Sequence, residues 1–347
     1  MSEGLTRHKE LNGGAPPNWR SILPNPKQVE QDQEASPPKL YAIVSSWYDA
    51  DIIEANIKNC FAQGASRVFL LDNTSPDNTI ELAQKAGAIL AKEYKTEVYD
   101  EDLRIHLQNE LILSETTLRQ ESDLWWMVLD SDEFPTGKDG RTIIETIRGL
   151  PPEIRMVGCD SVDLYPTKDQ HYTAGHPALC MTHGVWRRGG MIEGTNCGHW
   201  KHPLIRLLNG QRDIAHNRGN HTVTVPNDSP LKQTGSPILQ ERLTKHSIFE
   251  PHFDITLFHA PIRSREAAQR RLEALCSTQR NKWDDQVTKN QGAIKRWESL
   301  NAIFEERWED VELPHTQMYG RSIRGLALYP WQVLLPNLKR EYLCEAL

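Results

Sequence analysis

The stretch KLYAIVSSWYDADIIEANIKNCFAQGASRVFLLD, residues 39–72, decides the fold class. Its apolar run Leu40–Val44 has the β-branched and aromatic composition of a strand that is buried on both faces. Apolar residues then recur at helical spacing across 51–63, and Gly64 follows as a residue suited to end a helix. Arg67–Leu71 predicts a second buried strand. Strand, helix and strand at this spacing are typical of a βαβ unit on a parallel sheet.

The same alternation continues downstream. A turn cluster at Asp72–Asn78 separates the second strand from the elements that follow. These are a helix at Thr79–Ala86, a strand at Ala88–Leu90, a helix at Arg104–Glu121, a strand at Leu124–Leu129, a helix at Thr142–Leu150 and a strand at Arg155–Leu164. The sequence therefore predicts an α/β fold, with a Rossmann-type, mostly parallel sheet flanked by helices. Right-handed crossovers bring the carboxyl ends of such strands to one edge, where ligands are expected to bind.

Both ends of the chain differ from this core. Residues 1–38 are rich in Pro, Gly, Gln and Glu and hold few large apolar residues, which predicts a flexible N-terminal tail. Residues 39–262 predict the main α/β domain. Residues 263–347 return to helical patterning, most clearly at Arg265–Leu275 and Ala293–Trp308, and predict a helical C-terminal region.

The composition excludes several classes of protein. The chain carries 40 Lys and Arg against 47 Asp and Glu, a formal net charge of −7, which argues against a general nucleic-acid binder. Its longest apolar runs are far shorter than the roughly 20 residues of a membrane span, and no secretory signal is visible. The 6 cysteines form no CxxC pair, which is typical of reduced thiols. A cytoplasmic protein is expected, with peripheral attachment to a membrane left open.

An acidic cluster directly follows the predicted strand Leu124–Leu129. In an extended backbone, Asp130 and Asp132 would point the same way, because side chains alternate with a period of two. Two carboxylates at the carboxyl edge of a parallel sheet suit Mg²⁺ or Mn²⁺ shared with a phosphate. A solvated acidic turn is the alternative, but the buried apolar strand before the pair favours a functional site.

The segment that contains this acidic cluster resembles a known family. WWMVLDSDEF, residues 125–134, resembles the W-x-x-x-x-D-x-D-E-F segment of family 2-like glycosyltransferases with the GT-A fold. Three further segments are similar to that family in the same order, namely WYDADIIE at 47–54, LDNTSPDNT at 71–79 and LFHAPIRS at 257–264. Asp49 stands where the family usually has Glu. The resemblance covers residues 39–265.

The resemblance implies a metal-dependent, inverting glycosyltransferase that takes a sugar from a nucleotide diphosphate sugar, with a UDP-sugar as the expected donor. It implies that Mn²⁺ or Mg²⁺ stabilises the leaving diphosphate, and that Asp130, Asp132 and His259 hold this ion. It also implies a donor site in which residues at the ends of strands contact the nucleotide and basic side chains contact the diphosphate. The residues carried over to this donor site are Ser45, Trp47, Asp72, Asn73, Asp130, Lys201 and Arg263.

An inverting transfer needs a general base that takes the proton of the acceptor hydroxyl. The family uses a carboxylate beyond the fourth strand, and Asp163 and Glu193 are the candidates here, with no motif to choose between them. The acceptor is left open as a glycan, a small molecule or a protein. Histidines concentrate between His171 and His259, where they either line an acceptor pocket or are ordinary loop residues. The C-terminal helices would shape the acceptor side or form a homodimer contact.

Two other functions remain as alternatives. A nucleotidyltransferase acting on a sugar phosphate shares the α/β core and the metal, but it usually carries G-x-G-T-R after the first strand. This chain has SSWYDAD there, at residues 45–51. A non-catalytic carbohydrate-binding protein is the second alternative, and the intact DSDEF at residues 130–134 argues against it.

Overall fold

The computed structural model describes residues 37–96, 100–137, 140–150, 154–167, 170–187, 201–210, 214–216, 223–224, 255–270, 301–307 and 329–330. Contacts divide the chain into residues 1–36 and 37–347, so everything described belongs to the second unit. Three parts of the sequence prediction lie outside the described residues. They are almost all of the N-terminal tail, the candidate base Glu193 and most of the helical C-terminal region. Within that C-terminal region, 265–270 and 301–304 are helical.

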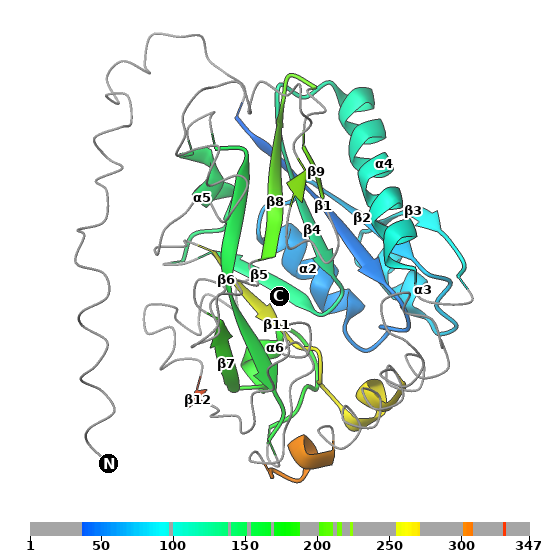
Figure 1. Cartoon of the computed structure of the whole chain (residues 1–347), viewed down its shortest axis with the longest axis vertical. Coiled ribbons are helices and arrows are strands. Elements are labelled where there is room, and N and C mark those ends of the chain that lie inside the picture. Colours follow the sequence, from blue (N-terminus) through cyan, green and yellow to red (C-terminus); the bar gives the residue numbers. More distant parts are fainter. Residues whose placement is uncertain are drawn as a thin grey trace, which may run out of the picture. The chain divides into compact units, whose positions relative to one another are not determined.

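The N-terminal half of the described chain alternates strands and helices as predicted. Its elements are β1 (Lys39–Ser46), α2 (Ile53–Ala62), β2 (Arg67–Asp72), α3 (Thr79–Lys85), β3 (Ile89–Glu93), α4 (Glu101–Arg119) and β4 (Asp123–Asp130). The four strands lie in the spatial order β3-β2-β1-β4, and every neighbouring pair among them is parallel (Figure 1). The predicted α/β fold, with parallel strands and flanking helices, is confirmed.

The second half of the described chain adds both antiparallel and parallel strands to this sheet. Its elements are β5 (Glu133–Gly137), α5 (Ile143–Arg148), β6 (Met156–Tyr165), α6 (Pro177–Cys180), β7 (His183–Arg187), β8 (Lys201–Leu208), β9 (Ala215–His216), β10 (Val223–Thr224), β11 (Ile255–His259) and β12 (Tyr329–Pro330). β8 runs antiparallel between β4 and β6. β6 continues past β8 and pairs with β7 and, in parallel, with β11. β11 is thereby held between β5 and β6, beside the strand that follows the acidic cluster.

The core lies on both faces of the parallel strands. One face of β1 and β4, with Val44 and Met127, packs on α2, α3 and α5. The opposite face, with Ile43 and Val128, packs on α4 through Ile112. The apolar runs of both strands are buried throughout, as continuous hydrophobic strands between two helical layers should be. Helices packed on both faces of β1 and β4 thus support the sheet edge at which these strands end.

The sequence does not predict β5, because Pro135 follows the acidic cluster as a stop signal. One edge of β5 pairs with β11. Amide side chains of α2, and of Gln63 directly after it, bond the other edge. Asn56 Nδ2 donates to the Glu133 carbonyl at 2.8 Å, and Asn59 Nδ2 donates to the Pro135 carbonyl at 3.0 Å. Gln63 Oε1 accepts from the Gly137 amide at 3.2 Å. Proline is tolerated in a strand at such an edge, where no second strand needs its missing N–H.

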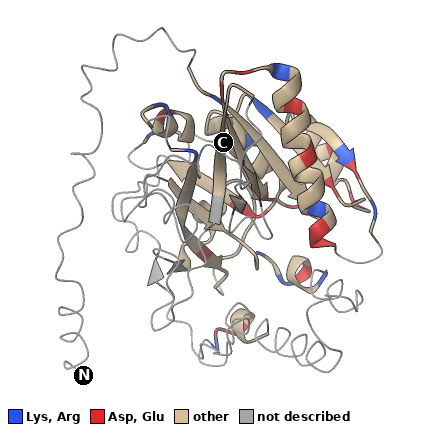
Figure 2. Cartoon of the chain, turned by 45° about the horizontal axis from the view of Figure 1, so that its top comes forward, with Lys and Arg blue, Asp and Glu red and all other residues tan. Residues whose placement is uncertain are grey.

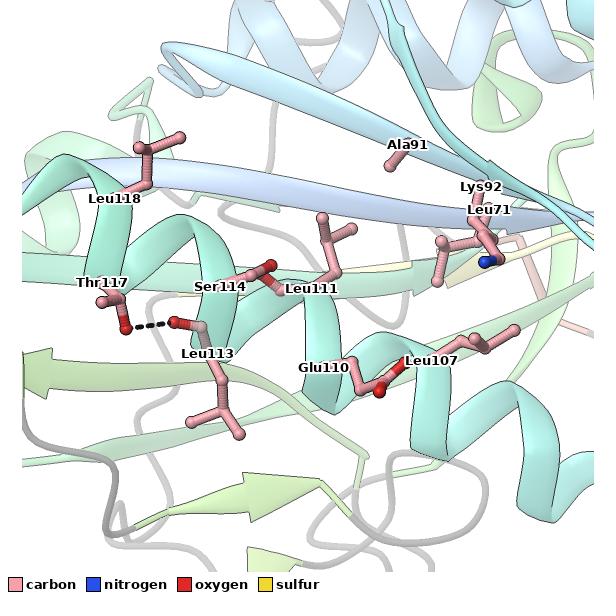
Figure 3. A pocket seen from close by; sticks show the side chains of 10 residues that line it. All are labelled: Leu71, Ala91, Lys92, Leu107, Glu110, Leu111, Leu113, Ser114, Thr117 and Leu118. Atoms are coloured by element: carbon pink, nitrogen blue, oxygen red, sulfur yellow. Dashed lines mark hydrogen bonds between the residues drawn. The ribbon is translucent and has the colours of Figure 1, made fainter.

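α4 carries interspersed acidic and basic residues (Figure 2). A mostly apolar cleft lies between this helix and the strands β2 and β3 (Figure 3). It is lined by Leu71, Ala91, Lys92, Leu107, Glu110, Leu111, Leu113, Ser114, Thr117 and Leu118, none of them a predicted site residue. No helix in the described part of the chain is both long and apolar enough to cross a membrane.

Candidate functional site

The carboxyl ends of β1, β2 and β4 meet at one edge of the sheet, and predicted site residues stand at each end. In the strand register, Ser45 lies opposite Asp130 and Ser46 lies opposite Asp72. β11 ends beside them, because the Ala260 amide donates to the Asp132 carbonyl at 2.9 Å. The structure therefore brings the ends of four strands together where the crossover rule expects a ligand.

The chain turns between Asp130 and Asp132, so the extended geometry expected from the sequence is not observed. β4 ends at Asp130, and Ser131 and Asp132 form a turn before β5. The Asp130 side chain is 32% exposed, and its Oδ1 accepts from Arg104 Nη1 at 2.8 Å. Asp132 is 2% exposed, and its Oδ1 lies 3.7 Å from His259 Nε2. The two carboxylates consequently have different partners.

His259 lies between two carboxylates. Its Nδ1 is 3.0 Å from Asp163 Oδ1, on the opposite side of the ring from Asp132. The register explains this, because His259 pairs with Asp163 on β6 and with Glu133 on β5, and directly opposed residues share one face of a sheet. Burial acts to lower the pKa of His259, but the charge of Asp132 and the hydrogen bond to Asp163 outweigh burial and raise it.

Asp132 and His259 have the separation of two ligands of one cation. Ligand atoms about 2.1 Å from an ion lie about 3–4 Å from each other, and the gap of 3.7 Å falls in this range. Mg²⁺ is commonly held by one or two protein carboxylates and completed by phosphate oxygens and water. No group of three or more His, Cys, Asp or Glu suited to a metal ion occurs within the described residues. Phosphate oxygens and water would supply the further ligands of an ion held by this pair.

Asp72 and Asn73 shape the loop after β2. Asp72 is fully buried, and its Oδ2 accepts from Ser46 Oγ and Ser75 Oγ, each at 2.7 Å. Asn73 bonds Thr96 instead, since its Oδ1 accepts from the Thr96 amide at 3.1 Å and its Nδ2 donates to Thr96 Oγ1 at 3.0 Å. The hydrogen bonds of both residues fix the conformation of the loop after β2. Their contact with a sugar donor stays a prediction.

The loop between β1 and α2 holds Tyr48 in the left-handed region, at φ 63°. A bulky residue there costs about 1–3 kcal/mol and persists only where its surroundings enforce the conformation. The Tyr48 amide donates to Ser75 Oγ at 2.8 Å, and the Trp47 amide donates to Asp49 Oδ2 at 3.0 Å. The half-buried rings of Trp47 and Tyr48 lie 6.1 Å apart, and the Arg270 guanidinium carbon lies 4.9 Å from the centre of the Tyr48 ring. Such partly exposed rings can stack on a base.

Arg263, a predicted diphosphate contact, is 1% exposed and binds two carboxylates. Its Nη2 lies 2.7 Å from Asp49 Oδ1, and its Nε lies 2.6 Å from Asp51 Oδ2. Burial acts to raise the pKa of Asp51, but Arg263 outweighs it and holds that pKa below its usual value. Arg263 thus fixes the β1–α2 loop to the segment after β11, and its donor contact stays a prediction.

α4 supplies two site residues that the motifs do not indicate. It begins at Glu101, ahead of the expected start, because the Asp100 side chain accepts from the Leu103 amide at 3.0 Å. The buried Arg104 therefore lies inside the first turns, where its Nη1 binds Asp130. One turn later, Gln108 Nε2 donates to Ser45 Oγ at 2.9 Å. Polar residues four apart on the buried side of an amphipathic helix are the sequence signal for this pair.

Of the three remaining predicted residues, Lys201 and Glu193 lie where little or nothing is described. Lys201 opens β8, and only its backbone is described. Glu193 lies outside the described residues. Asp163 is described: it is buried on β6, and its Oδ1 lies 3.0 Å from His259 Nδ1. Their predicted roles as a donor contact and as general bases stay predictions.

No family model matches the chain, and no curated protein matches it. Solved structures do match. Glucosyl-3-phosphoglycerate synthase from Mycobacterium tuberculosis, in complex with Mn²⁺, UDP and glucosyl-3-phosphoglycerate, is 13% identical over 36% of this chain and 44% of that chain, with a TM-score of 0.24. Mannosyl-3-phosphoglycerate synthase from Rubrobacter xylanophilus is 14% identical over 40% of this chain and 44% of that chain, with a TM-score of 0.22. The match thus spans less than half the length of these structures.

Proposed function

We propose that this protein is a metal-dependent glycosyltransferase that moves a sugar from a nucleotide diphosphate sugar to an acceptor hydroxyl. The observation that carries the proposal is the pairing of Asp132 with His259 across 3.7 Å, at the edge where the parallel strands end. A carboxylate and an imidazole together suit Mn²⁺. The same edge is where open α/β sheets bind nucleotides.

The charges at this edge support a requirement for a cation. Among the described side chains, Asp132, Glu133 and Asp163 surround His259, and Asp130 stands two positions before Asp132. Two cations lie near them, and both are bound to carboxylates: Arg104 to Asp130, and Arg263 to Asp49 and Asp51. A diphosphate would be repelled by this excess of carboxylates unless a divalent cation lay between them. When bound, Mn²⁺ or Mg²⁺ would neutralise the diphosphate and stabilise it as a leaving group.

The chain's own residues would divide the remaining work. Asp132 and His259 would hold the ion. Asp130, fixed by Arg104, would face the donor ribose and diphosphate, and the Trp47 ring would stack on the base, for which uracil is the expected choice. Of the two candidate general bases, the buried position of Asp163 and its bond to His259 favour Glu193.

The β1–α2 loop argues against a nucleotidyltransferase. Such an enzyme would offer backbone amides after its first strand to cradle phosphates. In this chain the amides of residues 47–50 donate to side chains of the protein instead. Their acceptors are Asp49 Oδ2, Ser75 Oγ, Thr79 Oγ1 and Asp77 Oδ2. The loop therefore lacks the open cradle that nucleotidyl transfer would use.

Thermal shift with UDP and Mn²⁺ tests the donor site. The melting temperature of the wild type should rise with both present and much less with either alone, because each completes the other's site. Asp132→Asn should lose this rise. Asp102→Asn, the same change at an exposed position of α4, should keep it.

A panel of nucleotide sugars, read by released nucleotide, then separates transfer from simple binding. A glycosyltransferase should release nucleotide from one sugar donor in a Mn²⁺-dependent way. A carbohydrate-binding protein would release none. A wild type that gains no stability from UDP with Mn²⁺ would contradict the proposal.

A further inference from the structure

We infer that Asp163 is a positioning residue that fixes the tautomer and direction of the His259 ring, and so sets the affinity of the site for its divalent cation. This inference rests on the proposed function. Its basis is the arrangement of one ring between two carboxylates, with Asp163 Oδ1 3.0 Å from Nδ1 and Asp132 Oδ1 3.7 Å from Nε2.

The backbone holds Asp163 rigidly behind His259. The two residues are register partners on the adjacent parallel strands β6 and β11. On its other side, β6 packs closely against β7, where a Cβ added at Gly184 would lie 2.7 Å from the Asp163 carbonyl oxygen. The Asp163 side chain is 3% exposed, so its carboxylate has little room to swing away from the imidazole.

The hydrogen bond determines which nitrogen can bind a metal. An ionised carboxylate only accepts hydrogen bonds, so the contact with Asp163 requires the His259 proton on Nδ1. In the neutral imidazole, this leaves the lone pair on Nε2, which is the nitrogen on the Asp132 side. A carboxylate behind a metal-binding histidine both orients the ring and makes the ligating nitrogen more basic.

Loss of this carboxylate would release the ring. With no acceptor at Nδ1, the proton could move to Nε2 and donate to Asp132, which would close the gap that a cation needs. Partners of this kind change metal affinity by about 10- to 100-fold in other metal sites. The burial of Asp163 suits this role better than proton transfer from an acceptor hydroxyl.

The test is Mn²⁺ affinity in the presence of saturating UDP, measured from the electron paramagnetic resonance signal of free Mn²⁺. Asp163→Ala should weaken Mn²⁺ binding by about 10- to 100-fold. Asp163→Asn, whose amide oxygen can still accept the Nδ1 proton, should recover part of that loss. Ser161→Ala, at a buried position two residues earlier on the same strand, should bind as the wild type does.

The outcomes separate this inference from the proposed function. A wild type that binds no Mn²⁺ with UDP overturns the proposed function, and this inference with it. A wild type that binds, together with a folded Asp163→Ala that binds equally well, overturns the inference alone. If Asp163→Ala does not fold, Asp163→Val, which also lacks an acceptor for the Nδ1 proton, decides, and wild-type affinity in that variant overturns the inference.

Discussion

Arg263 and Asp49 form a buried ion pair, with Nη2 2.7 Å from Oδ1 and both side chains at most 2% exposed. Asp49 also accepts from Ser131 Oγ at 2.5 Å, so it ties the loop after β1 to the turn between Asp130 and Asp132. One carboxylate thereby links three segments that are far apart in the sequence. The shape of the candidate site depends on this link.

Removal of the cation from this pair should destabilise the fold. Arg263→Met removes the cation that faces the buried Asp49 carboxylate, and the loss of one member of a buried ion pair typically costs about 3–5 kcal/mol. The free energy of unfolding from urea denaturation measures the loss. Arg148→Met, at an exposed position of α5, should change it by less than about 0.5 kcal/mol. The double variant Asp49→Asn with Arg263→Met should recover part of the loss, and no recovery would contradict this account.

The contact between Arg104 and Asp130 should matter for turnover. Arg104→Leu frees the partly exposed Asp130 to leave its position, and a misplacement of about 1 Å can cost about 100-fold in rate. We expect kcat/KM for the nucleotide sugar, read by released nucleotide, to fall by about 10- to 100-fold. Arg119→Leu, on the same helix and paired only within it to Glu115 among the described contacts, is the control. Equal kcat/KM in both variants would refute the role of Arg104.

Stability should fall in acid because of His176. This ring lies between Phe134 and Phe258, at centroid distances of 5.2 and 5.3 Å, and burial lowers its pKa from 6.5 to about 3. Below about pH 6.5 His176 is protonated in the unfolded chain, but it stays neutral in the folded chain down to about pH 3. His176 therefore removes about 1.4 kcal/mol of stability per pH unit between about pH 6.5 and 3.

His176→Asn tests this slope. Asn can still accept from the Ala178 amide, as His176 Nδ1 does at 3.2 Å, but it does not titrate. The variant should be less stable than the wild type at pH 7.5, because it loses the ring packing. This deficit should shrink as urea titrations move to pH 5. A deficit for His176→Asn that stays constant over this pH range would disprove the assignment.

The side chain of Gln63, the residue that follows α2, should protect the end of β5 and the start of α5. Gln63 Oε1 accepts from the Gly137 and Ile143 amides, each at 3.2 Å. Gln63→Met leaves both donors buried without this acceptor, at a cost of about 1–3 kcal/mol for each. Hydrogen exchange at these two amides should accelerate, while Gln84→Met, at an exposed position on α3, leaves it unchanged. Unchanged exchange in Gln63→Met would show that other contacts protect these two amides.

Local patterns were sufficient to predict the parallel half of the sheet. The apolar runs at 40–44, 67–71 and 124–129 each became a buried strand with bounds shifted by one or two residues. The reason is that a strand covered by helices on both faces must be apolar at every position. The start of α4 was missed by three residues, because Asp100 caps a turn that lacks apolar periodicity.

The sequence by itself determined the α/β class, and it placed Ser45, Asp72 and Asp130 at strand ends. Only the tertiary structure decided which side chains meet. Asp163 and His259 face each other because β6 and β11 pair in parallel, although 96 positions separate them in the chain. Arg263 reaches Asp49 across 214 positions. Local periodicity records which side of an element is buried, whereas the pairing of distant strands depends on how complete surfaces pack together.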